Sequence, residues 1–351
     1  MNSLKEQIKA EALRLGFSFI GFSRPQQTPH FANYKNWLMG SQPEELDYLK
    51  KDYVVVARKN PAILLENAQT VIVLGIAYPN PDSTIIKDNS DKKGFGQIAS
   101  YACLPDYHRW LKERARELEK FIRSIDNPGL KTRVFVDSGP VMEKDFAFQA
   151  GLGWVGKNSL FISAIFGSFC LLGCLYVDLK LEPDMQNNND LCGACELCIQ
   201  SCPTGAIFND RTINASRCIS FLTTNYKRAI PPELCGKIGK QVFGCDICQT
   251  VCPINNRESF TNSQKENRLS PIIENRVDLS NELFLGEQLF LKKYSETPLA
   301  KLPHEIFLRN LIIAAGNSGE YAFFEPLERL RGSHSSSIIQ STAEWAIASL
   351  I

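Results

Sequence analysis

The sequence lacks several features that would place it in a common class. It has almost no net charge, with 39 Lys and Arg against 38 Asp and Glu, so no overall field attracts nucleic acid or an anionic membrane. No G-x-G-x-x-G follows an apolar strand, which leaves a classical dinucleotide-binding fold without support. The first residues, MNSLKEQIKAEALRLG, show neither an apolar signal core nor a twin arginine, so we expect a cytoplasmic protein.

Long apolar runs are also scarce, with one exception. Residues 158–177 carry no charge over a length that would span a membrane. Gly167 and Ser168 interrupt this run, and Asn158 and Ser159 make one end polar. Two buried strands joined by a tight turn fit better, so we expect no membrane partner.

Composition and apolar periodicity predict three domains. In residues 1–181, strand-like apolar stretches alternate with amphipathic helical stretches, which favours an α+β or α/β domain. The polar segment 182–190 marks a boundary, and residues 182–262 form a cysteine-rich, ferredoxin-like domain. Residues 263–351 show helical periodicity and are expected to form all-α hairpins of the HEAT type. The expected helices of the first domain are 2–15, 106–124 and 140–150, its expected strands are 17–22, 70–77 and 131–136, and 79–96 is expected to be a loop.

Cysteine is what the sequence has in excess, because nine of its 12 cysteines lie between residues 192 and 252. In a cytosolic chain this indicates metal or redox chemistry rather than disulfides. A run C-x2-C-x2-C-x3-C-P starts at Cys192 and matches the bacterial ferredoxin pattern, and a shorter C-x2-C-x3-C-P starts at Cys245. The remaining cysteines, expected to be core thiols, are Cys103, Cys170 and Cys174.

Two such runs in tandem predict two [4Fe–4S] clusters whose ligands cross over between the runs. One cluster takes Cys192, Cys195, Cys198 and Cys252. The other takes Cys202, Cys245, Cys248 and an eighth ligand, either Cys218 or Cys235, which spacing alone leaves open. Zinc knuckles share the C-x2-C spacing, but the first run has one cysteine too many for a closed zinc site.

Several motifs resemble those of the epoxyqueuosine reductase family, in one order along nearly the whole chain. They are VDSGPVMEK at 136–144, GLGWVGKNS at 151–159, GSF at 167–169, LG at 172–173, CISFLT at 218–223 and GCDICQ at 244–249. YA at 101–102, DYH at 106–108, RN at 309–310 and GN at 316–317 extend the match. The resemblance implies a cobalamin-dependent reductase with two [4Fe–4S] clusters that acts on a modified wobble nucleoside in tRNA. It also selects Cys218 as the eighth ligand.

The implied cobalamin suits the clusters, because cobalt can collect electrons that clusters deliver singly. The D-x-H-x-x-G mark of a histidine ligand to cobalt is absent and the chain has only four histidines, so we expect base-off cobalamin. An external donor of the flavodoxin or ferredoxin type is expected to supply the electrons. The residues expected to contact cobalamin are Arg58, Ser100, Tyr101, Asp137, Gly156, Lys157, Asn158, Ser159, Ser220 and Asp246.

Asp137 matches the family's proton donor. From the residues alone, capping of a helix that starts near Pro140 is an equally good interpretation. A carboxylic acid that donates near neutral pH needs a raised pKa, so we expect burial against the corrin, Phe135 and Val136 to raise the pKa of Asp137.

A tRNA partner would need local basic patches in a chain with so little net charge. The candidate positions are Lys227, Arg228, Lys237, Lys240, Arg257, Lys292, Lys293 and Arg309. Two alternative functions are a second kind of reductase and an electron-transfer protein. One is a cobalamin and iron–sulfur reductive dehalogenase, a class that typically carries a twin-arginine signal. The other is a ferredoxin-type electron-transfer module, which would not need a carboxylate beside a glycine-rich loop.

Overall fold

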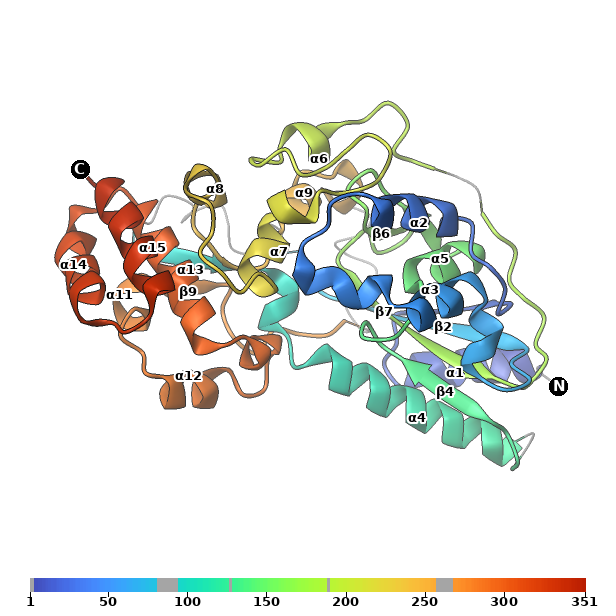
Figure 1. Cartoon of the computed structure of the whole chain (residues 1–351). Coiled ribbons are helices and arrows are strands. Elements are labelled where there is room, and N and C mark those ends of the chain that lie inside the picture. The colour runs from blue at the N-terminus through green and yellow to red at the C-terminus, as the bar shows by residue number, and fades with distance from the viewer. Residues whose placement is uncertain (1–2, 81–93, 126–127, 188–189, 257–267) are drawn as a thin grey trace.

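The computed structural model describes residues 3–80, 94–125, 128–187, 190–256 and 268–351. The N-terminal sheet and its helices occupy one end of the molecule, the cysteine-rich segment lies in the middle, and the C-terminal helices form the other end (Figure 1). Among the described residues, no helix combines the length and apolar character needed to cross a membrane.

The N-terminal part is built around a four-stranded sheet. Its strands are β1 (Phe19–Ser23), β2 (Thr70–Ala77), β4 (Thr132–Phe135) and β7 (Cys170–Val177), in the order β1-β2-β7-β4. Each adjacent pair is antiparallel. This part is therefore α+β, and the α/β alternative, which requires parallel neighbours, is wrong. The long segment from β1 to β2 returns to the end of the sheet that it left, which makes these two strands antiparallel.

Helices cover both faces of this sheet. Every residue of β2 is buried, as expected for a central strand with no charged side chain. Because side chains alternate along a strand, its even-numbered residues pack with α1 (Leu4–Arg14) and α4 (Tyr107–Ile125). Its odd-numbered valines pack with α5 (Glu143–Gln149) on the other face.

Most of the expected elements are confirmed, with shifted ends, and the expected strand 70–77 coincides with β2. The helix expected over 140–150 begins only at Glu143. Two further helices, α2 (Phe31–Met39) and α3 (Asp52–Lys59), were not predicted. Within the expected loop 79–96, residues 81–93 lie outside the described residues, and β3 (Phe95–Ile98) begins at its end.

The uncharged segment 158–177 contains two strands, as predicted, but they do not form a hairpin. β6 (Phe161–Ser163) pairs with β5 (Gly153–Val155), whereas β7 joins the main sheet. Gly167 lies between them with a φ of 69°, a left-handed conformation that favours glycine.

Further elements lie in the cysteine-rich segment and in the C-terminal region. In the cysteine-rich segment they are α6 (Leu197–Gln200), a 3₁₀ turn (Ala215–Arg217), α7 (Ile219–Thr224), α8 (Pro232–Ile238), β8 (Gln241–Phe243), α9 (Ile247–Thr250) and a 3₁₀ turn (Pro253–Asn256). In the C-terminal region they are β9 (Arg276–Asp278), α11 (Leu279–Glu282), α12 (Glu287–Tyr294), a 3₁₀ turn (Pro298–Lys301), α13 (His304–Gly316), α14 (Phe324–Ser333) and α15 (Ser337–Ala348). The helices α13, α14 and α15 pack around one apolar cluster.

A second sheet ties the three parts together. Its order is β8-β3-β9, so it takes one strand from the N-terminal part, one from the cysteine-rich segment and one from the C-terminal region. The expected boundary between residues 181 and 182 lies in a described segment, whereas the one between 262 and 263 lies outside the described residues.

Candidate active site

The eight predicted cluster cysteines separate into two groups in space. Burial raises the pKa of the Cys198 thiol, and repulsion from the neighbouring thiols of Cys192, Cys252 and Cys195 adds to the rise. Repulsion between like charges acts at short range, so these four sulfurs are neighbours. The indole Nε1 of Trp154 donates a hydrogen bond to Cys192 Sγ at 3.4 Å.

The second group contains the other four cysteines. Burial raises the pKa of Cys245 to about 12, and the thiols of Cys218 and Cys202 contribute to this rise. Cys248 is affected in the same way by Cys245 and Cys218. Both groups combine thiols from both runs, which is compatible with the predicted crossover; which thiols bind which cluster stays a prediction. In contrast, Cys235 is buried in an apolar cluster and directs its Sγ toward Ile230 O at 3.6 Å.

The described thiols do not meet at one point. Within the part of the chain that the structure describes, no three His, Cys, Asp or Glu side chains converge as they do around a single ion. A cubane, whose four irons are each bound by one thiolate, suits sulfurs that are neighbours without meeting at one point.

The core-thiol prediction holds in part. Cys103 and Cys174 are buried. Cys170 is only partly buried and lines a cavity, described next.

A cavity of about 340 Å³ lies between the N-terminal part and the second cysteine group. Most of its lining is apolar or aromatic, with a few polar side chains, as in typical small-molecule sites. Cys202, Cys218, Cys245 and Cys248 form part of its wall. A cluster bound by these four cysteines would therefore border the cavity directly.

The predicted cobalamin contacts fall into three sets. Those that line the cavity are Tyr101, Asn158, Ser220 and Asp246. Ser100 lies behind this wall, where its backbone N–H and Oγ donate to Asp246 Oδ2 at 2.7 and 2.8 Å. Those outside the lining are Arg58, Asp137, Gly156, Lys157 and Ser159. Arg58 instead lies over the ring of Tyr34, at 4.6 Å from its centroid.

A buried polar network joins the two sides of the cavity. Ser168 Oγ donates to Gln249 Oε1 at 3.0 Å, and Asn255 Nδ2 donates to Ser168 Oγ at 2.9 Å. Gln249 Nε2 in turn donates to Asp246 Oδ1 at 3.0 Å. Because satisfied buried networks fix the relative positions of their members, this one holds the cysteine-rich segment against the N-terminal sheet.

Asp137 lies beside the cavity at the centre of a tight turn. Its φ is 55°, in the left-handed region, and Ser138 N donates to Val136 O at 2.6 Å, which closes a three-residue γ-turn. The Tyr107 hydroxyl, whose residue lines the cavity, donates to Asp137 Oδ2 at 3.0 Å. His108 Nε2 lies 3.2 Å from the same oxygen. The turn therefore presents the carboxylate to two groups at the start of α4.

The structure corrects two expectations for Asp137. It does not cap a helix, because α5 begins at Glu143 and its N-cap residue is Met142. Its pKa is also not raised. The hydrogen bond with His108, opposed by burial and assisted by Tyr107, lowers the pKa of Asp137. Its side chain is 66% exposed, so the effect of burial does not outweigh these hydrogen bonds.

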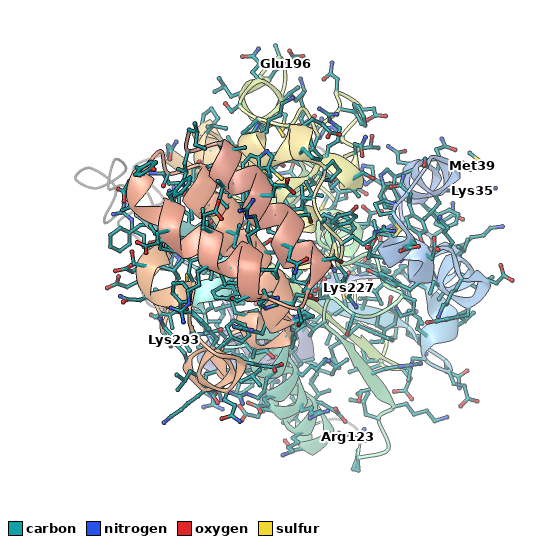
Figure 2. All side chains as sticks on the ribbon, turned by 60° about the vertical axis from the view of Figure 1, so that its left-hand side comes forward. Lys35, Met39, Arg123, Glu196, Lys227 and Lys293 are labelled. Carbon is teal, nitrogen blue, oxygen red and sulfur yellow. The ribbon has the colours of Figure 1, made fainter. Side chains whose placement is uncertain are left out.

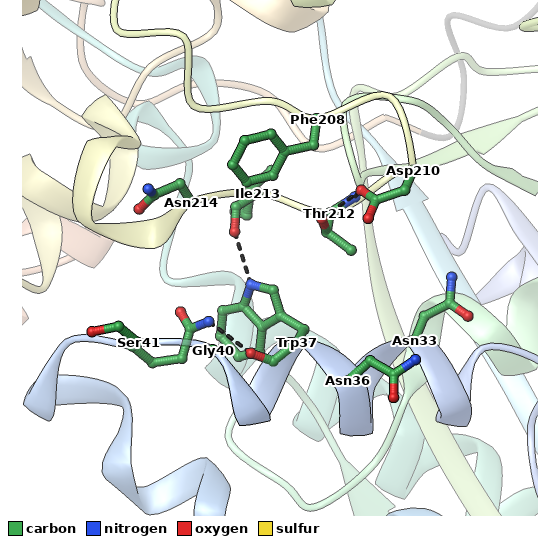
Figure 3. A pocket seen from close by; sticks show the side chains of 11 residues that line it. Asn33, Asn36, Trp37, Gly40, Ser41, Phe208, Asp210, Thr212, Ile213 and Asn214 are labelled. Carbon is green, nitrogen blue, oxygen red and sulfur yellow. Dashed lines mark hydrogen bonds between the residues drawn. The ribbon is translucent and has the colours of Figure 1, made fainter.

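A second hollow, of about 570 Å³, lies beside the cavity (Figure 3). Helix α2 forms one side of it and the loop 208–214 the other. Trp37 Nε1 donates to Ile213 O at 2.8 Å across this hollow, and Ile213 lines both spaces. None of the predicted site residues lines it.

The candidate tRNA-binding cations differ in their exposure and in their ion pairs. Arg309 is 0% exposed, so its prediction as a surface contact is wrong. It donates to the carbonyls of Leu222, Tyr226 and Arg228, which holds the segment after α7. Arg228 itself pairs with Glu44 and Glu45.

Lys293 forms an ion pair with Glu282. The candidates with no ion pair to a described residue are Lys227, Lys237, Lys240 and Lys292, and Arg257 lies outside the described residues. Figure 2 shows Lys227 on one side of the C-terminal helices and Lys293 on the other.

Sequence reasoning missed how Tyr107 and His108 are used. It noted DYH at 106–108 as a family motif and as a poor match to a cobalt-binding histidine. The contacts with Asp137 join residues 30 and 29 positions apart, and no local pattern reveals such a pairing.

Fold and site together define an iron–sulfur protein whose double-cluster domain borders the mostly apolar cavity of about 340 Å³. The model of the family described as Epoxyqueuosine reductase QueG, DUF1730 matches residues 58–138, and that of the 4Fe-4S double cluster binding domain matches residues 191–255. The chain belongs to the epoxyqueuosine reductase family.

Relatives and solved structures support this membership. An epoxyqueuosine reductase of Pseudomonas aeruginosa is 36% identical, with 98% of this chain and 94% of that protein covered. One of Escherichia coli is 33% identical, covering 100% and 90%. A structure of the Bacillus subtilis enzyme, with its catalytic aspartate loop swung out of the active site, superposes with a TM-score of 0.84 at 29% identity, covering 99% of this chain and 90% of that one.

Proposed function

We propose that this protein reduces epoxyqueuosine at the wobble position of tRNA to queuosine. The observation that carries this is the cavity whose wall contains four predicted cluster cysteines and the tyrosine that contacts Asp137. Electrons and a proton can thus reach one cavity from different sides. A structure described as an epoxyqueuosine reductase with an epoxyqueuosine-modified tRNA-Tyr stem loop is 28% identical and superposes with a TM-score of 0.82, covering 99% of this chain and 90% of that one.

The two clusters are assigned to the two groups of thiols. One is held by Cys192, Cys195, Cys198 and Cys252, and the other by Cys202, Cys218, Cys245 and Cys248. The second would pass electrons into the cavity. Ala206 N donates to Cys202 Sγ at 3.3 Å, and such N–H bonds to ligand sulfur tune the reduction potential of a cluster.

The cavity suits a corrin by the chemistry of its lining. Its aromatic and aliphatic walls fit a flat apolar macrocycle, and Asn158, Ser220 and Asp246 offer hydrogen bonds to amide groups at its rim. None of the four histidines, all of them described, lines the cavity, which supports base-off binding. When bound there, cobalamin would supply a strong cobalt reductant.

Asp137 would donate a proton to the substrate. In the chain alone its carboxylate is exposed and accepts hydrogen bonds from Tyr107 and His108. Binding of a nucleoside over this carboxylate would exclude water, and desolvation favours the neutral acid. The acid then lies where a proton is consumed, as general acid catalysis requires.

Each of the three parts would have one role in this reaction. Residues 1–181 would form the catalytic part, 182–262 the electron-delivering part, and 263–351 a HEAT-like region in contact with tRNA. The unpaired lysines named above would contact phosphates. An external flavodoxin- or ferredoxin-type donor would reduce the clusters. We place the protein in the cytoplasm, where cysteines remain reduced.

Two measurements test the proposal. Mass spectrometry of the nucleosides released from tRNA by nuclease digestion should show epoxyqueuosine accumulating in cells that lack the gene and queuosine returning on complementation. Purified protein with clusters, cobalamin and a low-potential reductant should convert epoxyqueuosine in a stem loop. Normal queuosine in the deletion strain, together with no conversion by the loaded protein, would refute the function.

A further inference from the structure

The proposed reaction needs two protons, and their source has to be identified. Loss of the epoxide oxygen as water, with formation of the alkene, consumes two electrons and two protons. The clusters account for the electrons. Asp137 carries at most one proton, so it must be reloaded within each turnover or be joined by a second donor. The inference below rests on the proposed function.

His108 is the titratable group best placed to reload Asp137. Its Nε2 lies 3.2 Å from Asp137 Oδ2, and its side chain is 19% exposed, so its ring reaches both the carboxylate and solvent. The Tyr107 hydroxyl contacts the same oxygen at 3.0 Å. Burial raises the pKa of Tyr107 far above neutral, so this hydroxyl orients the carboxylate without giving up its proton.

A second carboxylate fixes the His108 ring. Asp106 Oδ1 lies 2.8 Å from His108 Nδ1, and Asp106 Oδ2 pairs with Lys301 Nζ at 2.9 Å. Lys301 Nζ also lies 3.0 Å from His108 Nδ1, so with a proton on Nδ1 two donors stand side by side and the Asp106 carboxylate accepts from both. The rings of Tyr107 and His108 stack with centroids 4.0 Å apart. These groups, from the start of α4, the turn at Asp137 and the C-terminal 3₁₀ turn, are the titratable neighbours of His108.

We propose that His108 relays protons from solvent to Asp137. In each relay step the Nε2–H bond of the imidazolium breaks and an O–H bond forms on Asp137 Oδ2. Asp106 keeps the proton on Nδ1, so the ring is left as the neutral Nδ1–H tautomer. Nε2 then takes up a proton from water. His108 is a positioning and relay residue, since it acts on the substrate only through Asp137.

The test compares two histidines that each pair with a carboxylate. His30 Nδ1 lies 2.8 Å from Asp145 Oδ1, the same separation as in the His108–Asp106 pair, but the structure gives His30 no contact with Asp137. The variants are His108→Asn and, as the matched control, His30→Asn. Each is purified with full iron content and assayed on an epoxyqueuosine stem loop over a range of pH.

We expect His108→Asn to lower kcat about a hundredfold while KM for the stem loop stays unchanged. Its rate should rise toward acid pH and with added free imidazole, because an external acid then reloads Asp137. His30→Asn should keep the wild-type rate and pH profile.

Two results would overturn the relay. One is wild-type kcat in His108→Asn. The other is a reduced kcat with the wild-type pH profile and no response to imidazole, which would indicate a packing role. Both presuppose an active wild type. An inactive wild-type holoenzyme would refute the proposed function together with the relay.

Discussion

Asp137 combines a strained backbone with a carboxylate that takes part in no local cap. A left-handed φ is uncommon outside glycine, and the cost of such conformations persists where the surroundings require them. Here the turn brings Oδ2 within reach of Tyr107 and His108. The backbone geometry therefore serves the position of one side chain.

Substitution of Asp137 by Asn should separate catalysis from folding. The amide keeps the shape of the side chain but carries no transferable proton. We expect turnover to fall by about two to four orders of magnitude, with iron content, cobalamin retention and thermal unfolding unchanged. Turnover and cofactor content are measured on the same preparation. Near wild-type turnover with cofactors intact would leave Asp137 without a catalytic role.

Cys218 and Cys235 give a matched pair for the eighth cluster ligand. Cys218 lies with Cys202 and Cys245, whereas Cys235 packs among aliphatic side chains. Cys218→Ser should lose one cluster and about half of the iron, because a thiolate ligand is replaced by a hydroxyl. Cys235→Ser should keep all iron and lose only some stability. Iron and sulfide analysis of both variants identifies the ligand. Loss of iron in Cys235→Ser with full iron in Cys218→Ser would assign the eighth ligand to Cys235.

Glu143 predicts a pH dependence of stability. Burial raises its pKa to about 8, and its buried Oε1 has no hydrogen-bond partner among the described residues. The folded chain therefore holds this proton at pH values where the unfolded chain has lost it. Its contribution to stability is complete below pH 4.5, the ordinary pKa, and is lost as the pH rises through about 8.

Glu143→Gln should remove this loss, since the amide is neutral at every pH. The stability of the variant relative to wild type should increase between about pH 5 and 8, by at most about 1.4 kcal/mol per pH unit, less because the side chain is partly exposed. Urea unfolding at several pH values measures it. Glu11, whose pKa is lowered by its hydrogen bond with Arg14, is the control: Glu11→Gln should lose stability relative to wild type as the pH rises through the acid range below 4.5 and show no trend between about pH 5 and 8. A pH-independent difference for Glu143→Gln would contradict the buried neutral acid.

At the level of elements, the turn between β6 and β7 locks the cysteine-rich segment to the sheet. A Cβ on Gly167 would lie 2.0 Å from Asn255 Oδ1, the atom that accepts a hydrogen bond from Ser168 N at 2.8 Å. Close approach of the Asn255 side chain to the backbone of Gly167 is thus built into this turn. It explains why the uncharged segment 158–177 bends here instead of forming one long element.

Gly167→Ala should be more harmful than the same change at Gly319. Both glycines have a φ near 69°, at 69° and 68°, so alanine costs about 1–2 kcal/mol at either position. Nothing lies within 4 Å of a Cβ on Gly319, whereas Gly167→Ala must also displace Asn255, which adds about 1–3 kcal/mol. Thermal unfolding of both variants measures the difference. Equal losses would mean that the Asn255 contact is unimportant.

Sequence patterns were informative where the signal is local. The cysteine spacing predicted that Cys198 would lie near Cys192, Cys195 and Cys252, although it left the choice between Cys218 and Cys235 open, and the apolar run at 70–77 predicted β2 with its exact ends. These patterns failed where a residue's environment is set by contacts with distant parts of the chain. Arg309 reads as a surface cation, yet it is buried because three main-chain carbonyls satisfy its guanidinium. The link between Lys301 and Asp106 spans 195 positions, so only the folded chain shows it.

For the whole molecule, the candidate phosphate-binding lysines predict how salt affects tRNA binding. Each phosphate contact releases counterions, so the affinity should fall linearly on a log–log plot against salt. Lys227→Ala should reduce the slope by about one, because this exposed side chain forms no ion pair with a described residue. Arg123→Ala, at a cation already paired with Glu119, should leave the slope unchanged. A salt-independent affinity would contradict phosphate recognition.

The β8-β3-β9 sheet has a consequence for synthesis on the ribosome. Its central strand, β3, is made first, but its partners follow about 145 and 180 residues later. Until then the nascent chain carries an unpaired strand with two open edges, which is a hazard for aggregation. Prematurely terminated chains that stop before residue 278 never complete this sheet. They should be cleared by proteases or held by chaperones, so quality control acts on this protein mainly at its carboxyl end.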